Sequence, residues 1–174
     1  MRILVVGATG TLGRPVVQAL SLVHDVVAAS RSGAVKVDIG DPTSIKAMYA
    51  ELGVVDAVVC AAGDAAYGPL AELTDDDFER SLHGKLMGQV DLLRLGLDNV
   101  SDDGSITLTA GTLARYPEPG SSALSLVNSA LEGFVRAAVA ARVCVARAAQ
   151  GPIDRVGSFS SFNKNSPGKS ESRA

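Results

Sequence analysis

The chain has 174 residues, of which 47% are hydrophobic, and a formal net charge of −3, as expected for one ordinary globular domain. No apolar run reaches the roughly 20 residues of a membrane-spanning helix, and the N-terminus lacks a secretion signal, so we expect a cytoplasmic protein with no membrane partner. The negative net charge and the lack of a basic patch interleaved with aromatic residues argue against a nucleic-acid partner.

Strands and helices alternate along most of the chain. Apolar runs without alternation predict buried strands at residues 2–6, 25–31, 34–39, 55–63 and 104–111. Apolar residues at helical spacing predict helices from about residue 13, from residue 42, over residues 75–97 and over residues 121–141. This order predicts an α/β fold, a Rossmann-like doubly wound parallel sheet in a three-layer α/β/α arrangement.

Capping residues mark three of the expected helix starts. Asp41 precedes Pro42, which is tolerated in a first turn, and Thr74 with Asp77 resembles a capping box. Ser121 or the serine after it would cap the last helix.

The periodic pattern ends after about residue 142. The run VCVAR (143–147) is compatible with one more short strand, whereas residues 158–174 are polar, Ser-rich and without periodicity. We therefore expect a dinucleotide-binding domain over residues 1–157 and a disordered tail over residues 158–174.

The two cysteines, Cys60 and Cys144, lie among valine and alanine residues. A free thiol in such surroundings behaves as a small apolar side chain rather than as half of a disulfide. No group of Cys and His residues has the spacing of metal ligands, so we expect no metal site.

A glycine pattern, G-x-x-G-x-x-G, lies between the first strand and its helix, at Gly7, Gly10 and Gly13. Glycine permits a tight turn, lets the backbone approach a diphosphate, and brings the helix close to the sheet. The helix N-terminus adds free N–H groups and a positive potential. The sequence therefore predicts a dinucleotide site, with a glycine-rich turn that binds nothing as the alternative. Besides the glycines, the residues expected in this turn of the site are Thr9, Thr11 and Leu12.

The end of the second strand distinguishes the two nicotinamide dinucleotides. An acidic residue there would bind the ribose 2′-hydroxyl of NAD, whereas this chain has Ser30, Arg31 and Ser32. The arginine fork and the two hydroxyls suit a 2′-phosphate, so we expect NADP, with NAD as the other candidate cofactor. The alternative is that Arg31 is a solvated loop charge.

Two further segments follow strands at their carboxyl ends, where such sheets bind ligands. Asp38, followed by Ile39, is placed to accept a hydrogen bond from the adenine amino group. Ala61, Ala62 and Gly63 leave room for the adenosine ribose.

Together these segments resemble the short-chain dehydrogenase/reductase family over residues 1–140. The resemblance rests on GATGTLG (7–13), SRS (30–32), Asp38, CAAG (60–63), DDDFERSLHGKLMG (75–88), GSITLTAG (104–111) and PGSSALSLVNSALEGF (119–134). The glycine spacing is similar to that of the atypical or extended branches of the family. The resemblance implies an NADP-dependent oxidoreductase with a small carbonyl or alcohol substrate, or else a non-catalytic NAD(P)-binding sensor or subunit.

All four catalytic positions of that family are substituted in this chain. Leu124 stands at the tyrosine position, Asn128 at the lysine position, Gly111 at the serine position and Lys85 at the asparagine position. In the family, the phenol gives a proton to the substrate carbonyl oxygen while hydride arrives from the nicotinamide. A leucine side chain has no proton to give.

Three residues are candidates to replace this machinery. Lys85 would polarise a carbonyl or bind the nicotinamide ribose, Asn128 would bind a ribose hydroxyl, and Thr109 would orient a carbonyl. The alternatives are that Lys85 extends to solvent, that Asn128 is a helix-surface residue and that Thr109 is an ordinary strand residue.

Tyr116 is a weaker candidate acid because it lies in a proline-rich loop. His24 and His83 have no Ser or Asp placed to complete a triad and are interpreted as surface or packing residues.

Family members usually extend beyond this length and often dimerise through the long helices. The resemblance therefore implies a homo-oligomer formed through the helices at 75–97 and 121–141. It also implies either a reduced member that buries its sheet edge by self-association, or a chain that diverges after about Ala141 through a frameshift or premature stop. In the latter case the protein could be a remnant that binds nothing usefully.

Overall fold

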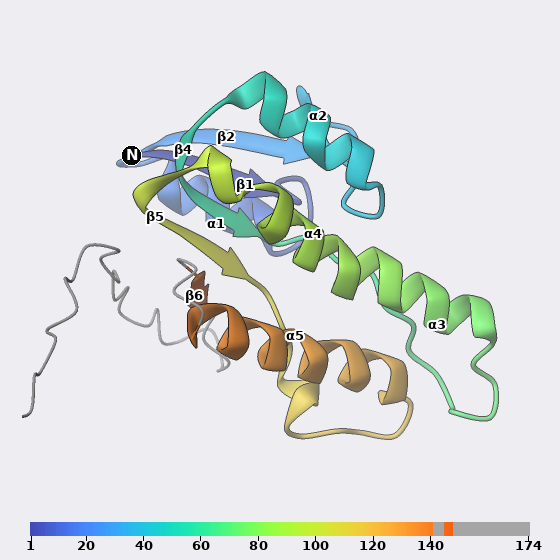
Figure 1. The fold of residues 1–174 in the computed structure, drawn as a ribbon. Coiled ribbons are helices and arrows are strands. Elements are labelled where there is room, and N and C mark those ends of the chain that lie inside the picture. Colours follow the sequence, from blue (N-terminus) through green and yellow to red (C-terminus); the bar gives the residue numbers. More distant parts are fainter. Residues whose placement is uncertain (141–144, 148–174) are drawn as a thin grey trace, which may run out of the picture.

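Six strands form one parallel sheet in the order β3-β2-β1-β4-β5-β6 (Figure 1). The strands are β1 (Arg2–Val6), β2 (Asp25–Ser30), β3 (Val35–Lys36), β4 (Val55–Cys60), β5 (Val100–Leu108) and β6 (Val145–Arg147). The strand order reverses between β1 and β4, which confirms the predicted doubly wound sheet. This computed structural model describes residues 1–140 and 145–147, so Cys144 and the tail expected over residues 158–174 lie outside the described residues.

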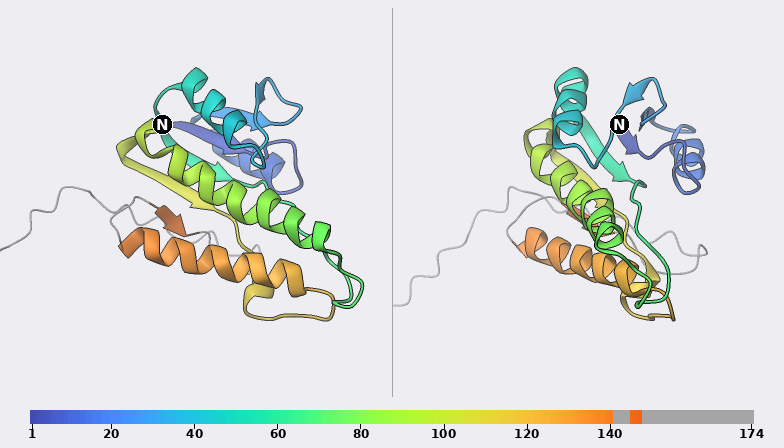
Figure 2. Two further views of the ribbon diagram at one scale, coloured as in Figure 1. Left: turned by 45° about the vertical axis from the view of Figure 1, so that its right-hand side comes forward. Right: turned by 90° about the vertical axis from the view of Figure 1, so that its right-hand side faces the viewer.

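Helices cover both faces of the sheet, which confirms the three layers (Figure 2). The helix α1 (Gly13–Leu20) lies on one face, and α2 (Pro42–Leu52), α4 (Gly88–Leu95) and α5 (Ser122–Ala140) lie on the other. Right-handed crossovers between parallel strands dictate this distribution. None of the described helices is both long enough and apolar enough to cross a membrane.

Each face of the sheet has its own apolar core, because successive strand residues point to opposite faces. Leu4 and Val6 belong to the larger core, under α2, α4 and α5. Ile3 and Val5 belong to the smaller core, against α1. Among these residues the largest exposed fraction is the 5% of Ile3, so the continuous apolar run at 2–6 is explained by burial on both sides.

Two of the three predicted helix caps are confirmed. The Asp41 carboxylate accepts a hydrogen bond from Thr43 N at 2.8 Å. Thr74 and Asp77 form a reciprocal capping box at the start of α3 (Asp75–Ser81). The bond from the Thr74 backbone N–H lowers the pKa of Asp77. Ser121 precedes α5 (Ser122–Ala140), but its Oγ accepts from Glu118 N at 3.0 Å and Ser122 Oγ has no partner among the described residues, so neither serine caps this helix through its side chain there.

The long helix expected over residues 75–97 is interrupted. After α3 the chain forms a π-helical turn, η1 (Leu82–Met87), before α4 begins. In this turn Gly88 N–H donates to the carbonyls of His83 and Lys85. Such turns are often found at functional sites, because they change which side chains share a helix face.

Two predicted strands end earlier than expected and a third is much shorter. The segments 55–63 and 104–111 leave the sheet after Cys60 and Leu108, although β5 starts earlier than predicted, at Val100. The segment 34–39 forms only the two residues of β3, because the chain turns at Asp38 to enter α2 through Pro42. The short strand expected at 143–147 is confirmed over residues 145–147.

Candidate functional site

The glycine turn after β1 is tight and has no room for side chains. Gly7 has a φ of +84°, and its N–H donates to Ala29 O at 2.9 Å. A Cβ atom at Gly7 would lie 2.8 Å from the backbone of Ala61, and one at Gly13 would overlap the Gly7 carbonyl. The turn therefore requires glycine at both positions.

The outer side of this turn is open to a ligand. Thr9, Gly10, Thr11 and Leu12 are exposed, and no side chain caps the first N–H groups of α1. Uncapped N–H groups at a helix N-terminus are suited to bind an anion. Arg14 adds a cation here, with its Nε donating to Thr9 O at 2.9 Å.

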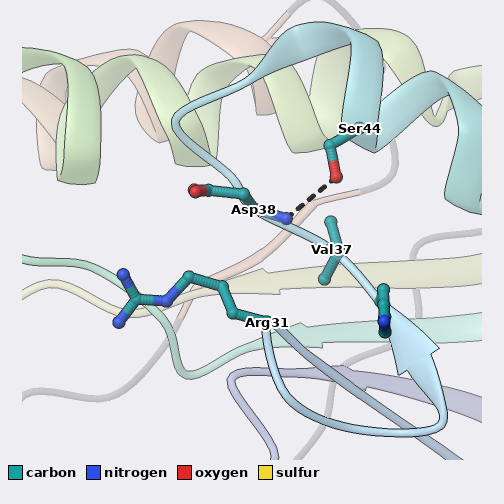
Figure 3. A pocket seen from close by; sticks show the side chains of 5 residues that line it. Arg31, Val37, Asp38 and Ser44 are labelled. Carbon is teal, nitrogen blue, oxygen red and sulfur yellow. Dashed lines mark hydrogen bonds between the residues drawn. The ribbon is translucent and has the colours of Figure 1, made fainter.

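A pocket of about 250 Å³ lies at the carboxyl ends of β2 and β3 (Figure 3). Arg31 and Asp38 extend over it in the same direction. The Asp38 carboxylate accepts from Gly40 N at 2.9 Å, and Asp38 N donates to Ser44 Oγ at 3.0 Å. The pocket is lined by Arg31, Lys36, Val37, Asp38 and Ser44.

Lys36 and Ser44 are pocket residues that the sequence analysis missed. Lys36 lies two residues before Asp38, and side chains two apart on a strand share a face, so this signal was available. Within the described ranges neither Arg31 nor Lys36 forms an ion pair. The pocket thus presents two cations without a carboxylate partner.

The three residues of the SRS segment lie in different surroundings. Arg31 and Ser32 are exposed beside the pocket, whereas Ser30 is only 5% exposed. The buried Ser30 Oγ has no hydrogen-bond partner within the described part of the chain. Ile39, also expected at the site, is buried in the larger core.

Lys85 lies in the π-helical turn, and its side chain packs on Gly63, just beyond the end of β4. A Cβ atom at Gly63 would lie 2.8 Å from Lys85 Cγ, so the lysine stem covers this glycine. Partial burial lowers the pKa of Lys85. No carboxylate within the described residues pairs with its ammonium group.

Asn128 occupies the corresponding place beyond the end of β5. It is 1% exposed, so the alternative of a helix-surface residue is wrong. A Cβ atom at Gly111 would lie 2.8 Å from Asn128 Nδ2, so the amide fills the space of a side chain at that position. Asn128 Oδ1 is buried without a hydrogen-bond partner among the described residues. Leu124, one turn earlier on α5, is half-buried.

A buried glutamine between the two strand ends is another residue that sequence reasoning missed. Gln89 Nε2 donates to Thr109 O at 3.0 Å and to Ala62 O at 3.3 Å. Gln89 Oε1 accepts from Thr109 N at 3.0 Å. Thr109 therefore lies just after β5 rather than within it, and its backbone is fully engaged.

The cysteine in this region is buried below the site. Cys60, the last residue of β4, is a free thiol that donates to Ala62 O at 3.5 Å. Burial raises the pKa of Cys60 to about 11, so the thiol is un-ionised near neutral pH.

The minor candidates lie apart from these groups. The Tyr116 side chain is 74% exposed, and His83 is exposed with Nδ1 against Glu79 O at 3.0 Å. His24 is half-buried before β2. Within residues 1–140 and 145–147 no group of three or more His, Cys, Asp or Glu side chains is arranged to hold a metal ion.

Comparison with known proteins shows which family and which solved structures this chain is similar to. A family model described as enoyl-(acyl carrier protein) reductase matches residues 15–147. A short chain dehydrogenase, claC, of Passalora fulva is 29% identical over 114 residues, covering 63% of this chain and 43% of the relative. Versicolorin reductase 1 of Aspergillus parasiticus is 29% identical over 108 residues, covering 59% and 41%. The chain thus spans less than half the length of these two relatives.

Solved structures share the fold over a larger part of the chain. The protein lin1944 of Listeria innocua superposes with a TM-score of 0.80 at 38% identity, covering 84% of this chain and 74% of that one. A small-chain dehydrogenase in complex with NADPH superposes with a TM-score of 0.76 at 25% identity, covering 81% and 64%.

Proposed function

This chain belongs to the short-chain dehydrogenase/reductase family, a family of oxidoreductases, and from that premise we propose that it uses NADP to interconvert a small carbonyl and its alcohol. Lys85 supplies the proton in place of the missing tyrosine.

The observation that carries the choice of NADP is the pocket with two unpaired cations. Arg31 and Lys36 line it, and Asp38 is already engaged by the backbone N–H of Gly40. A 2′-phosphate would give both cations a partner, whereas a free ribose hydroxyl would leave them unpaired. A related small-chain dehydrogenase has been solved with NADPH, which supports the same choice.

The glycine turn would hold the diphosphate of NADP. It is shaped so that a Cβ atom at Gly7 or Gly13 would collide with the backbone, and Arg14 lies next to it. The backbone N–H groups at the start of α1 would then bind phosphate oxygens. When bound, NADPH would supply the hydride for reduction of the carbonyl, and NADP⁺ would accept it in the reverse direction.

Lys85 is the proton donor of this proposal. Its stem lies on Gly63 and its pKa is lowered by burial, so its ammonium releases a proton more readily than an exposed lysine does. A general acid works best when its pKa approaches the operating pH. Asn128, with its buried and unpartnered Oδ1, would accept a hydrogen bond from a ribose hydroxyl, and Thr109 would face the substrate carbonyl.

A second candidate function is NAD(P) binding without hydride transfer, as a sensor or subunit. The observation in its favour is Leu124, which stands at the tyrosine position and has no proton to give. The two functions differ in turnover. We expect NADPH fluorescence to decay with at least one member of a panel of aldehydes and ketones, and binding without turnover across the panel would favour the second function.

The chain is also proposed to form a homo-oligomer through the helices at 75–97 and 121–141. Met87, Leu126 and Val139 on these helices are 41%, 48% and 40% exposed, which is high for large apolar side chains. Sedimentation velocity should give at least twice the monomer mass, and Leu126→Glu should return the chain to the monomer.

A further inference from the structure

The hydrogen-bond ladder between β4 and β5 stops before the site. The last paired residues are Cys60 and Leu108. Beyond them the two segments of the chain separate, and no backbone hydrogen bond joins Ala62 directly to Thr109. The side-chain amide of Gln89 lies between them and bonds to Ala62 O, Thr109 O and Thr109 N.

The side-chain amide of Gln89 takes the place of one backbone pairing between the two strands. Its amide offers a donor and an acceptor in the same way as a backbone peptide group, and it is 0% exposed. An unpaired backbone group in such a place is costly, so Thr109 N and Thr109 O depend on this one side chain, whereas Ala62 O also accepts from Cys60 Sγ at 3.5 Å. The distance between the two strand ends is therefore set by an amide rather than by direct pairing.

The two segments joined in this way are those that flank the site. Residues 61–63 end at Gly63, on which Lys85 packs, and residues 109–111 end at Gly111, beside Asn128. Any change in their separation would change the space in which a nicotinamide and a substrate must lie.

Gln89 and Lys85 are also joined through the helix. Lys85 lies within the π-helical turn and Gln89 follows the end of this turn by two residues, with Gly88 N–H donating to the carbonyls of His83 and Lys85. On the other side of the turn, a Cβ atom at Gly88 would lie 2.8 Å from Ile39 O, so the helix is in close contact with the segment after β3. The helix is thus held at two points, by Gly88 packing on Ile39 and by the bonds of Gln89.

We infer that Gln89 is a positioning residue, whose buried amide fixes the separation of segments 61–63 and 109–111 and thereby the place of Lys85. The catalytic consequence of this inference rests on the proposed function. The positioning itself is measured by amide exchange and by acylation of Lys85, neither of which requires enzymatic turnover.

The main variant is Gln89→Met, which keeps the length of the side chain but removes all three hydrogen bonds. Amide exchange of Thr109 should become about 10 to 100 times faster, while Ile106 and Leu108 in the paired strand keep their rates. The midpoint of acylation of Lys85 against pH, followed by peptide mass spectrometry, should rise towards that of an ordinary lysine as water enters.

Leu92→Val is the matched control, because Leu92 is fully buried on the same helix but its side chain forms none of the hydrogen bonds that join the strand ends. It should leave both quantities unchanged. If Gln89→Met leaves both unchanged, or if the control changes them equally, Gln89 is a structural residue only and the inference is wrong.

Gln89→Glu keeps the test decisive if the methionine variant does not fold. Its carboxylate still accepts from Thr109 N, so Thr109 should stay protected, while the new negative charge near Lys85 raises the acylation midpoint. An exposed Thr109 amide or an unchanged midpoint would overturn the inference.

Turnover separates this inference from the proposed function. If the unmodified chain reduces a carbonyl, Gln89→Met should lower kcat about tenfold and change the Kd for NADPH less than threefold, since the adenosine end is held elsewhere. A loss of NADPH affinity with kcat unchanged would contradict the positioning role. If the unmodified chain does not bind NADPH, the proposed function fails while Thr109 exchange and Lys85 acylation still decide the inference.

Discussion

Lys85 is the residue on which the proposed chemistry depends most. It combines a cation, partial burial and packing on the glycine at the end of β4, with no carboxylate to neutralise it within the described residues. Structural lysines are rarely placed this way, because burying an unpaired charge costs free energy. Functional sites often carry this desolvation cost, because burial there shifts the pKa values of their titratable groups.

Replacing Lys85 by methionine should therefore separate activity from stability. Because burial lowers the pKa of Lys85 in the folded chain, the unfolded chain binds more protons between the lowered and the ordinary value, and stability rises with pH across that interval. Lys85→Met should abolish this rise and raise the unfolding midpoint at pH 7, while turnover falls by about 10²- to 10⁴-fold.

Thermal unfolding and NADPH oxidation measured on the same preparations check this prediction. Lys46→Met is the control, since Lys46 is exposed on α2. A variant at position 85 that is less stable than the unmodified chain at pH 7, with turnover retained, would show that Lys85 is a packing residue.

Arg31 and Lys36 in the pocket at the carboxyl ends of β2 and β3 should both contribute to NADPH affinity. Arg31→Ala and Lys36→Ala should each weaken NADPH about tenfold, because each removes a charged hydrogen-bond partner, and leave NADH within twofold. Fluorescence titration of both nucleotides measures this, with Lys46→Ala as the control for loss of one surface charge. Equal losses of affinity for NADPH and NADH would mean that the pocket does not bind the 2′-phosphate.

Most elements of this fold could be predicted from the sequence because burial decides them. The apolar runs at 2–6 and 25–31 and the caps at Asp41 and Thr74 depend only on neighbouring residues, and the structure confirms them. The ends of β4 and β5 depend on Gln89, which is 29 and 19 residues away from Cys60 and Leu108 along the chain. No local pattern reveals that contact, so the carboxyl ends of both strands were predicted three residues too late in the chain.

The π-helical turn was missed for a similar reason. It adds one residue to a helix turn and so leaves the apolar periodicity of residues 75–97 almost unchanged. Of the candidate site residues, the sequence identified the positions of Lys85 and Asn128 through a family resemblance, whereas Gln89 has no counterpart among the positions that the resemblance supplied.

The turn between β1 and α1 should be intolerant of the smallest added side chain. Gly13→Ala places a Cβ atom against the Gly7 carbonyl, so it should cost about 1–3 kcal/mol of stability and weaken NADPH more than tenfold. Gly133→Ala in α5 is the control, because its Cβ atom would have no neighbour closer than 3.8 Å. It should stabilise the chain by about 0.5–1 kcal/mol. Urea unfolding and NADPH titration of both variants test this, and unchanged affinity in Gly13→Ala would contradict the assignment of the turn.

Charge is distributed unevenly over the whole molecule. Arg80, Arg94, Arg115 and Arg136, on or beside the helices α3, α4 and α5, form ion pairs with carboxylates. Arg14, Arg31, Lys36 and Lys85 at the carboxyl edge of the sheet form none within the described part of the chain. An edge with unpaired cations in a chain of net charge −3 favours an anionic ligand that runs from the pocket at β2 and β3 to the ends of β4 and β5.

Calorimetric titration of the 174-residue chain with NADPH and, separately, with NADH tests this account most directly. We predict one NADPH per chain, bound about tenfold or more tightly than NADH because Arg31 and Lys36 pair with the 2′-phosphate. Equal affinity for the two nucleotides, or no heat from either, would contradict it.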